Sequence, residues 1–457
     1  MGPGDFMRLL SINFTGNESK YMELYNYIKD AIIDGKMEPN EKLPSKRRMA
    51  EYLNISLNTV MEAYNLLLDE GFIISVPKKG YFVVPFDLSI KDEKSDIKLL
   101  DEDKKMKYDL RTNNIDSKHF PFYTFYKISK NILYSEDIME KIPSFGNIKL
   151  RNTIKKYLYE TRGINVNPAN IIIGSGIEYL LTNLIDILDS RSYAIENPGY
   201  NKIKRLIQNN NRIVELLPLD NEGVVIDNIE SDILYITPSN QFPTGIKMSM
   251  KRKTEIASWA KDNKYIIEDD FDSEFKYLSN TSLSLFDLNK EHTIILQTYS
   301  RSLSPSFRIA YMILPDELIS KYIERFSFYS STVSTIDQLI LEEYISSGAY
   351  SRNINRNKSL YKEKRDLIIE KLKDKPYLLI DYTNSYLSLI IELKPFDKER
   401  FKSLCLKDDI DISLLEDFYM DSTESNKLII GYSGIDIDLL SEAIDKLIEI
   451  IEKVLKK

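Results

Sequence analysis

The spacing of apolar and polar positions divides the chain into two unlike parts. Over the first 84 residues apolar side chains recur at helical spacing in three short segments, the first of which carries Tyr21, Leu24 and Ile28. Two short apolar runs, 72–76 and 81–84, then flank a Pro-Lys-Lys-Gly turn. Three helices followed by a β-hairpin are typical of a winged helix-turn-helix, in which the third helix enters the major groove of DNA.

From residue 108 onward, short apolar runs alternate with longer segments of helical periodicity. This alternation predicts an α/β fold with a mostly parallel sheet that is covered by helices on both faces. After about residue 316 the pattern becomes mostly helical. The predicted strands are 171–173, 192–195, 233–237, 265–268, 293–297 and 309–314.

A charged segment separates the two parts. Residues 85–107 mix acidic and basic side chains with little apolar periodicity, which indicates a solvated connector. We therefore predict a DNA-binding domain at 7–84, a linker at 85–107 and a large domain at 108–457, to which the resemblance described below assigns an effector and dimerisation role.

Composition narrows the class of protein. Hydrophobic residues form 43% of the 457 residues, which is enough for the cores of two domains. The net charge of -8 excludes a uniformly basic coat for nucleic acid but leaves room for a local basic patch. One cysteine excludes an internal disulfide framework and fits a reducing cytoplasm, and no apolar run is long enough for a membrane span. With two histidines, no metal site is expected.

Eight residues of the first domain are candidates for contact with double-stranded operator DNA. Three lie at the predicted start of the second helix, where backbone N–H groups and positive charge suit a phosphate. Two lie in the first turn of the third helix, within reach of base edges. Three belong to the turn of the hairpin. They are Ser45, Lys46, Arg47, Asn58, Thr59, Lys78, Lys79 and Gly80.

The order and spacing of these residues resemble the DNA-binding domain of GntR-type regulators. The matching runs are Leu-Pro-Ser-Lys-Arg at 43–47, Ser-Leu-Asn-Thr-Val at 56–60 and Glu-Gly-Phe at 70–72, and the resemblance makes Gly80 the glycine of the wing. Leu57 departs from the family, which usually has arginine there. The alternative is a small helical interaction domain whose lysines are only solvated, because this part of the chain is not basic overall.

Polar clusters follow five of the predicted strands. Since ligand sites of open α/β sheets gather at the carboxyl ends of strands, these clusters predict one composite pocket. The last of them continues into a loop, 298–308, that places hydroxyls and two guanidinium groups between two core strands. Burying such groups is costly without an anion to meet them, which favours a phosphate site. The clusters begin at 174, 196, 238, 269 and 298.

These clusters resemble the aminotransferase-like domain of MocR regulators, in which a winged helix is fused to a fold-type I pyridoxal-phosphate domain with a small C-terminal subdomain. The resemblance implies a homodimer and a site for pyridoxal phosphate. Its cofactor residues would be Ser175 and Gly176 for the phosphate, Tyr200 beside the ring, Asp269 for the ring nitrogen, and Thr298, Ser300 and Arg308 for the rest of the phosphate cup. Two positions depart from the family: Phe271 replaces a tyrosine, and Arg301 replaces the lysine that holds the cofactor.

Arg301 decides between regulator and enzyme. A Schiff base needs a neutral primary amine, whereas a guanidinium stays protonated. We therefore expect no catalytic residue and no enzyme activity, with pyridoxal phosphate bound non-covalently or lost. The favoured function is a cytoplasmic DNA-binding regulator that senses this cofactor or a small amine or amino-acid effector. The alternatives are a cofactor-free regulator whose large domain is a dimerisation scaffold and, less favoured, an aminotransferase.

Overall fold

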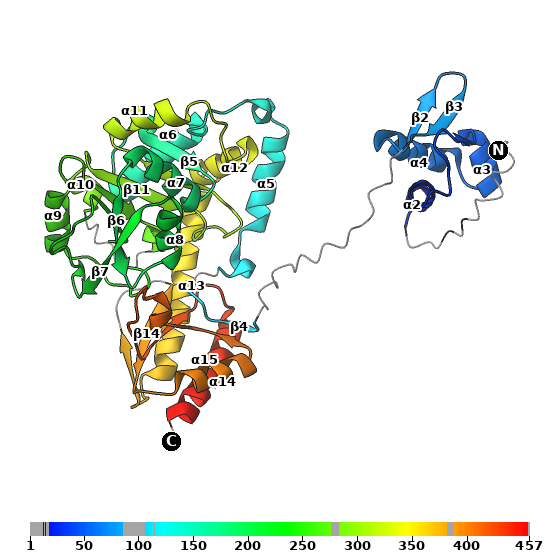
Figure 1. Cartoon of the computed structure of the whole chain (residues 1–457). Helices are drawn as coiled ribbons and strands as arrows, with labels where there is room; N and C mark the ends of the chain where they lie inside the picture. Colours follow the sequence, from blue (N-terminus) through cyan, green and yellow to red (C-terminus); the bar gives the residue numbers. More distant parts are fainter. Residues whose placement is uncertain are drawn as a thin grey trace. The chain divides into compact units, whose positions relative to one another are not determined.

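The computed structural model describes residues 12, 14, 18–85, 106–112, 115–275, 283–381 and 387–455. The chain divides into two compact units, Met1–Glu102 and Asp103–Lys457, and each is described by itself (Figure 1). The predicted linker at 85–107 falls largely outside the described residues. The domain bounds given above therefore stay predictions.

The small unit has the predicted order of three helices and a hairpin. Its sheet has the strand order β1-β3-β2, all antiparallel. Ser45 and Ser56 begin the second and third helices, because their hydroxyls accept hydrogen bonds from backbone N–H groups of the first turns. The short strand β1 was not predicted. The elements are α2 (Lys20–Ile33), β1 (Lys42–Leu43), α3 (Lys46–Leu53), α4 (Leu57–Asp69), β2 (Ile73–Val76) and β3 (Gly80–Val83).

An eight-stranded sheet organises the large unit, in the order β5-β12-β11-β10-β9-β6-β7-β8. The neighbours from β11 to β7 pair in parallel, while β12 is antiparallel to both of its neighbours. The prediction of a mostly parallel sheet is confirmed. The strands are β5 (Ile171–Gly174), β6 (Ser192–Asn197), β7 (Ile213–Asp220), β8 (Gly223–Val224), β9 (Ile233–Ile236), β10 (Tyr265–Asp269), β11 (Thr293–Thr298) and β12 (Ala310–Ile313).

Helices cover both faces of this sheet, as strand β5 illustrates. Ile171 and Ile173 belong to one buried apolar cluster and Ile172 to another, because successive side chains of a strand point to opposite faces. Both faces are therefore core. The helices of this part are α5 (Phe122–Leu133), α6 (Ile148–Arg162), α7 (Ile177–Leu188), α8 (Asn201–Asn209), α9 (Met250–Trp259), α10 (Leu285–Leu288), α11 (Asp316–Phe326) and α12 (Thr335–Ser346).

The long helix α13 (Ala349–Leu372) leads from the sheet into the C-terminal subdomain (Figure 1). That subdomain is an antiparallel sheet in the order β13-β14-β17-β16, with two helices. A short strand from the beginning of the unit, β4, pairs with β15 of the subdomain. The elements are β4 (Tyr108–Asp109), β13 (Leu378–Asp381), β14 (Ser388–Leu393), α14 (Lys398–Lys407), β15 (Ile410–Asp411), β16 (Ser413–Leu414), β17 (Lys427–Gly431) and α15 (Ile437–Leu455).

Candidate functional site

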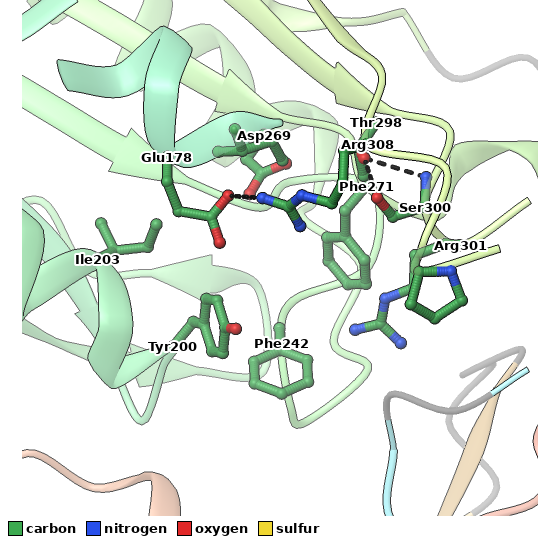
Figure 2. A pocket seen from close by; sticks show the side chains of 12 residues that line it. Glu178, Tyr200, Ile203, Phe242, Asp269, Phe271, Thr298, Ser300, Arg301 and Arg308 are labelled. Atoms are coloured by element: carbon green, nitrogen blue, oxygen red, sulfur yellow. Dashed lines mark hydrogen bonds and ion pairs between the residues drawn. The ribbon is translucent and has the colours of Figure 1, made fainter. Parts of the chain in front are cut away.

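A cavity of about 210 Å³ lies where several strands of the large sheet end. Asp269 and Thr298 are the last residues of β10 and β11, and the first turn of α7 follows β5. The polar clusters that follow separate strands thus meet in one place, as the α/β pattern predicted. The lining residues are Ile177, Glu178, Tyr200, Ile203, Phe242, Asp269, Phe271, Thr298, Ser300, Arg301, Pro305 and Arg308 (Figure 2).

Seven of the nine predicted cofactor residues line this cavity, and the other two, Ser175 and Gly176, lie just before α7. Gly176 has a φ of +105°, and a Cβ there would lie 2.5 Å from Nη2 of Arg308. The backbone conformation therefore favours glycine at this position, and a side chain there would displace the end of the Arg308 side chain. The backbone N–H of Ser175 donates to the hydroxyl of Thr332 at 3.2 Å.

Asp269 offers an unused acceptor to the cavity. Its Oδ2 accepts a hydrogen bond from the Tyr235 hydroxyl, whereas its Oδ1 is buried and has no partner among the described residues. Burial raises the pKa of the Asp269 carboxyl to about 7, although the Tyr235 hydrogen bond acts in the opposite direction. A buried acceptor without a partner is costly, so this oxygen suits an N–H group of a ligand.

Arg301 and Phe271, the two departures from the family, contact each other. The guanidinium carbon of Arg301 lies 5.2 Å from the centroid of the Phe271 ring, within the range of a cation–π contact. Nη1 of Arg301 also donates to the carbonyl oxygen of Thr112 at 2.7 Å. The ring and the carbonyl oxygen therefore fix the guanidinium at the wall of the cavity.

Two hydroxyls and an ion pair also line the cavity. The Thr298 hydroxyl donates to Oγ of Ser300 at 3.0 Å and accepts from the Ser300 backbone N–H at 3.1 Å. Nη2 of Arg308 lies 2.7 Å from Oε2 of Glu178 (Figure 2). The expectation of two guanidinium groups between core strands is wrong for Arg308, whose side chain is 51% exposed. It extends from the loop to the rim of the cavity, where water solvates its charge.

Five lining residues were missed by the sequence analysis: Ile177, Glu178, Ile203, Phe242 and Pro305. Phe242 lies in the polar cluster that begins at 238, and its ring contacts those of Tyr200, Phe271 and Phe418 at centroid distances of 5.2 to 6.0 Å. Its place in that cluster was the available signal. Glu178 gave a weaker one, because an acidic residue in the first turn of a helix is usual for helix stability alone.

The predicted DNA-contact residues gather around α3, α4 and the hairpin of the small unit. Ser45 is the N-cap of α3, with Arg47 exposed in the first turn, and Asn58 is exposed in the first turn of α4. Lys46 is less free than expected, because its Nζ lies 5.2 Å from the centroid of the Tyr81 ring and 3.4 Å from the side-chain oxygen of Asn65.

The other four residues of this set lie in α4 and in the hairpin. The Thr59 hydroxyl lies 2.8 Å from Oγ of Ser56, so it takes part in the cap of α4. Lys78 and Lys79 are exposed in the turn between β2 and β3. Gly80 has a φ of +114° and lies close to the side chain of Lys42, which explains the absence of a side chain there.

Comparisons with known proteins find matches to both units of the chain. A family model described as bacterial regulatory proteins, gntR family, matches residues 20–83. The HTH-type transcriptional regulator YdeL of Bacillus subtilis (strain 168), itself described as uncharacterized, is 33% identical over 95% of this chain and 97% of its own length. The HTH-type pyridoxine biosynthesis transcriptional regulator PdxR of Corynebacterium glutamicum is 25% identical over 92% of this chain and 93% of its own.

Further matches extend these results. The probable rhizopine catabolism regulatory protein MocR of Rhizobium meliloti is 25% identical over 93% of this chain and 92% of its own length. An archaeal alanine:glyoxylate aminotransferase of known crystal structure superposes with a TM-score of 0.68 at 23% identity, covering 76% of this chain and 91% of that one. This likeness shows the fold of the large unit. The chain belongs to the MocR subfamily of GntR-type transcription regulators, in which a winged helix-turn-helix precedes a fold-type I aminotransferase-like domain.

Proposed function

We propose that this regulator senses a pyridoxal-phosphate-type or amino-acid-type ligand in the cavity of its large domain, without turning it over. One observation carries the proposal. The cavity keeps a buried, unpartnered carboxylate oxygen on Asp269 and places a guanidinium, Arg301, in its wall instead of a primary amine. The first group favours binding of a ligand, and the second does not form a covalent bond to an aldehyde.

The cavity residues fit pyridoxal phosphate. Oδ1 of Asp269 would accept a hydrogen bond from the ring nitrogen, and the aromatic rings of Tyr200 and Phe242 would lie along the ligand. Thr298 and Ser300 would present hydroxyls to the phosphate. When bound, the cofactor supplies an aldehyde and an electron-withdrawing ring. The residues of this chain would hold and orient that group, and a free amine or amino acid would be the second component of the signal.

Arg301 is proposed to act through its charge. Its guanidinium lies over the ring of Phe271 and donates a hydrogen bond to the carbonyl oxygen of Thr112. A planar cation that is fixed in this way suits an oxyanion of the ligand, such as a phenolate or a carboxylate. Ligand recognition would then rest on hydrogen bonds and ion pairs, and no covalent bond would form.

Exposed aromatic side chains support a homodimer. Phe122, Tyr123 and Tyr126 on α5 and Phe328 and Tyr329 after α11 are each more than half exposed. Phe122, Tyr123 and Tyr126 are neighbours on one helix, and exposed apolar side chains that cluster in this way mark interfaces more often than scattered ones do. Most oligomers of identical chains are symmetric dimers. A second copy of the chain would cover these rings and would supply a second winged helix, so that the dimer would bind two repeated half-sites of operator DNA.

The DNA part of the proposal is tested by fluorescence anisotropy with labelled DNA from upstream of the protein's own gene. Arg47→Ala should weaken binding, because its exposed guanidinium lies at the start of α3 and is expected to contact a phosphate. Lys36→Ala, in the turn after α2, removes the same charge away from the predicted contact surface and is the control. Equal affinity of the wild type and Arg47→Ala would contradict the assigned interface.

The ligand part is tested by titration with pyridoxal phosphate, with and without amino acids, followed by borohydride reduction and intact mass. We expect binding by the wild type without a retained adduct at residue 301, and a retained adduct at that position in Arg301→Lys. The control is Arg325→Lys, which makes the same change on the exposed face of α11. Absence of binding in every combination would favour the alternative in which the large domain is only a dimerisation scaffold.

A further inference from the structure

One acidic side chain lines the cavity beside Arg308 and is not among the residues proposed to hold the ligand. Glu178, in the first turn of α7, divides its two carboxylate oxygens between two cations. Oε1 lies 2.6 Å from Nζ of Lys202, and Oε2 lies 2.7 Å from Nη2 of Arg308. Glu178 and Arg308 both line the cavity (Figure 2).

These ion pairs lie against the segment that would hold a phosphate. A Cβ at Gly176 would be 2.5 Å from Nη2 of Arg308 and 3.1 Å from Oε2 of Glu178. The Glu178 carboxylate therefore lies directly over the backbone at the start of α7, where N–H groups favour an anion. The Glu178 carboxylate thus takes the place that an oxyanion of a ligand would occupy.

The charges at this end of the cavity follow from these contacts. Although burial acts to raise the pKa of the Glu178 carboxyl, the hydrogen bonds from Lys202, its own backbone N–H and Arg308 prevail and lower it to about 2. Glu178 is thus ionised at neutral pH. Two cations and one anion leave a single net positive charge, whereas a ligand phosphate carries close to two negative charges. A phosphate beside an ionised Glu178 meets like-charge repulsion.

We propose that Glu178 is an internal counter-anion that competes with a ligand's phosphate for Arg308 and Lys202 and so biases the cavity toward ligands without a phosphate. The proposal builds on the sensing function given above and specifies its ligand class. A phosphate enters only when the Glu178 side chain leaves both cations. A ligand with a neutral or singly negative group at this end, such as pyridoxal or a free amino acid, leaves both ion pairs in place.

The test is isothermal titration calorimetry on the full-length chain with pyridoxal phosphate, pyridoxal and inorganic phosphate. Glu178→Gln keeps the shape of the side chain and removes its charge. Glu178→Ala controls for any effect of the introduced amide group itself. The control, Asp186→Asn, removes one negative charge from the same helix, where Asp186 pairs with Arg325 at 2.7 Å outside the cavity. Thermal melting of each variant checks its fold.

We expect Glu178→Gln to bind pyridoxal phosphate and inorganic phosphate about fivefold or more tightly than the wild type, which is the size of effect of one partly exposed charge acting on a dianion. The affinity for pyridoxal should stay the same, and Asp186→Asn should behave as the wild type. No gain for either phosphate-bearing probe in both Glu178 variants overturns the proposal.

The outcomes also separate this inference from the sensing function. If the wild type binds neither pyridoxal compound while Glu178→Gln gains affinity for inorganic phosphate, sensing of the cofactor is refuted and the role of Glu178 stands. If the wild type binds pyridoxal phosphate and neither Glu178 variant binds it more tightly, the role of Glu178 is refuted and sensing stands.

Discussion

Asp269→Asn should remove a pH-dependent loss of stability from the large unit. Asp269 is 8% exposed, and burial is the main reason why the pKa of its carboxyl rises from 3.8 to about 7. A raised carboxyl pKa means that the native state binds the proton more tightly than the unfolded chain does. The stabilisation by this proton is complete below the unfolded pKa and is lost as the pH rises through about 7.

The size of the effect follows from the same shift. A rise from 3.8 to about 7 corresponds to about 4 kcal/mol. Asparagine keeps the shape of the side chain, and its amide oxygen can still accept the Tyr235 hydrogen bond. Between about pH 4 and about pH 8, the unfolding free energy of the wild type should therefore fall relative to that of the variant by up to ~4 kcal/mol. Glu268, whose pKa burial also raises to about 7, is present in both proteins and cancels. Burial likewise raises the pKa of Glu196 to about 7, but the charge of Asp269 contributes to that rise, so Glu196 cancels only in part.

Urea denaturation followed by tryptophan emission measures this difference directly. The chain has one tryptophan, Trp259, which lies in α9 of the large unit, so its emission reports on the unit that carries Asp269. The unfolding free energies of the wild type and Asp269→Asn are compared at several pH values between about 4 and 8. A difference that stays constant over this range would refute the view that Asp269 is a buried carboxyl with a strongly raised pKa.

Three further predictions concern the core, the wing and the dimer. Lys364→Met should lower the unfolding free energy by ~1.5–3 kcal/mol in the same tryptophan assay, because fully buried Lys364 lies 3.2 Å from Oδ2 of the buried Asp116. Asp116 would keep its contacts with the Lys118 backbone N–H and with His119, and a change below ~1 kcal/mol would contradict this. Lys79→Ala should reduce the salt dependence of operator binding by about one phosphate contact, whereas Lys36→Ala should not. Tyr126→Glu should give a monomer in light scattering, because it replaces an exposed ring of α5 by a carboxylate. A persistent dimer would exclude this surface as the dimer interface.

The sequence predicted the main elements because their signals are local. Ile171 to Ile173 and the run from Ile309 to Leu314 are apolar throughout, as expected for strands that are buried on both faces. Strand β7 was missed because it is only partly buried, with Ile213 67% exposed, and its pattern does not stand out from a loop. The antiparallel direction of β12 depends on contacts with β5 and β11 that no local pattern encodes.

Most residues that line the cavity were predicted from the sequence, but the contacts between them were not. Polar residues at strand ends identified Asp269 and Thr298, because the carboxyl ends of neighbouring parallel strands meet at one edge. Which groups pair there depends on side-chain geometry across elements that are far apart in sequence. The contacts of Glu178 with Lys202 and Arg308 span 24 and 130 residues and were not predicted. The cation–π contact of Arg301 with Phe271 was not predicted either.

We expect that occupation of the cavity by a small ligand, without covalent attachment, changes the affinity of this regulator for operator DNA. Fluorescence anisotropy of labelled upstream DNA, titrated with the full-length chain in the presence and absence of pyridoxal phosphate, pyridoxal and amino acids, tests it most directly. At least one of these ligands should change the affinity for DNA in the wild type, and Asp269→Ala should abolish the change without altering DNA affinity in the absence of ligand. DNA affinity that is the same with every ligand, or a ligand effect that persists in Asp269→Ala, would contradict this expectation.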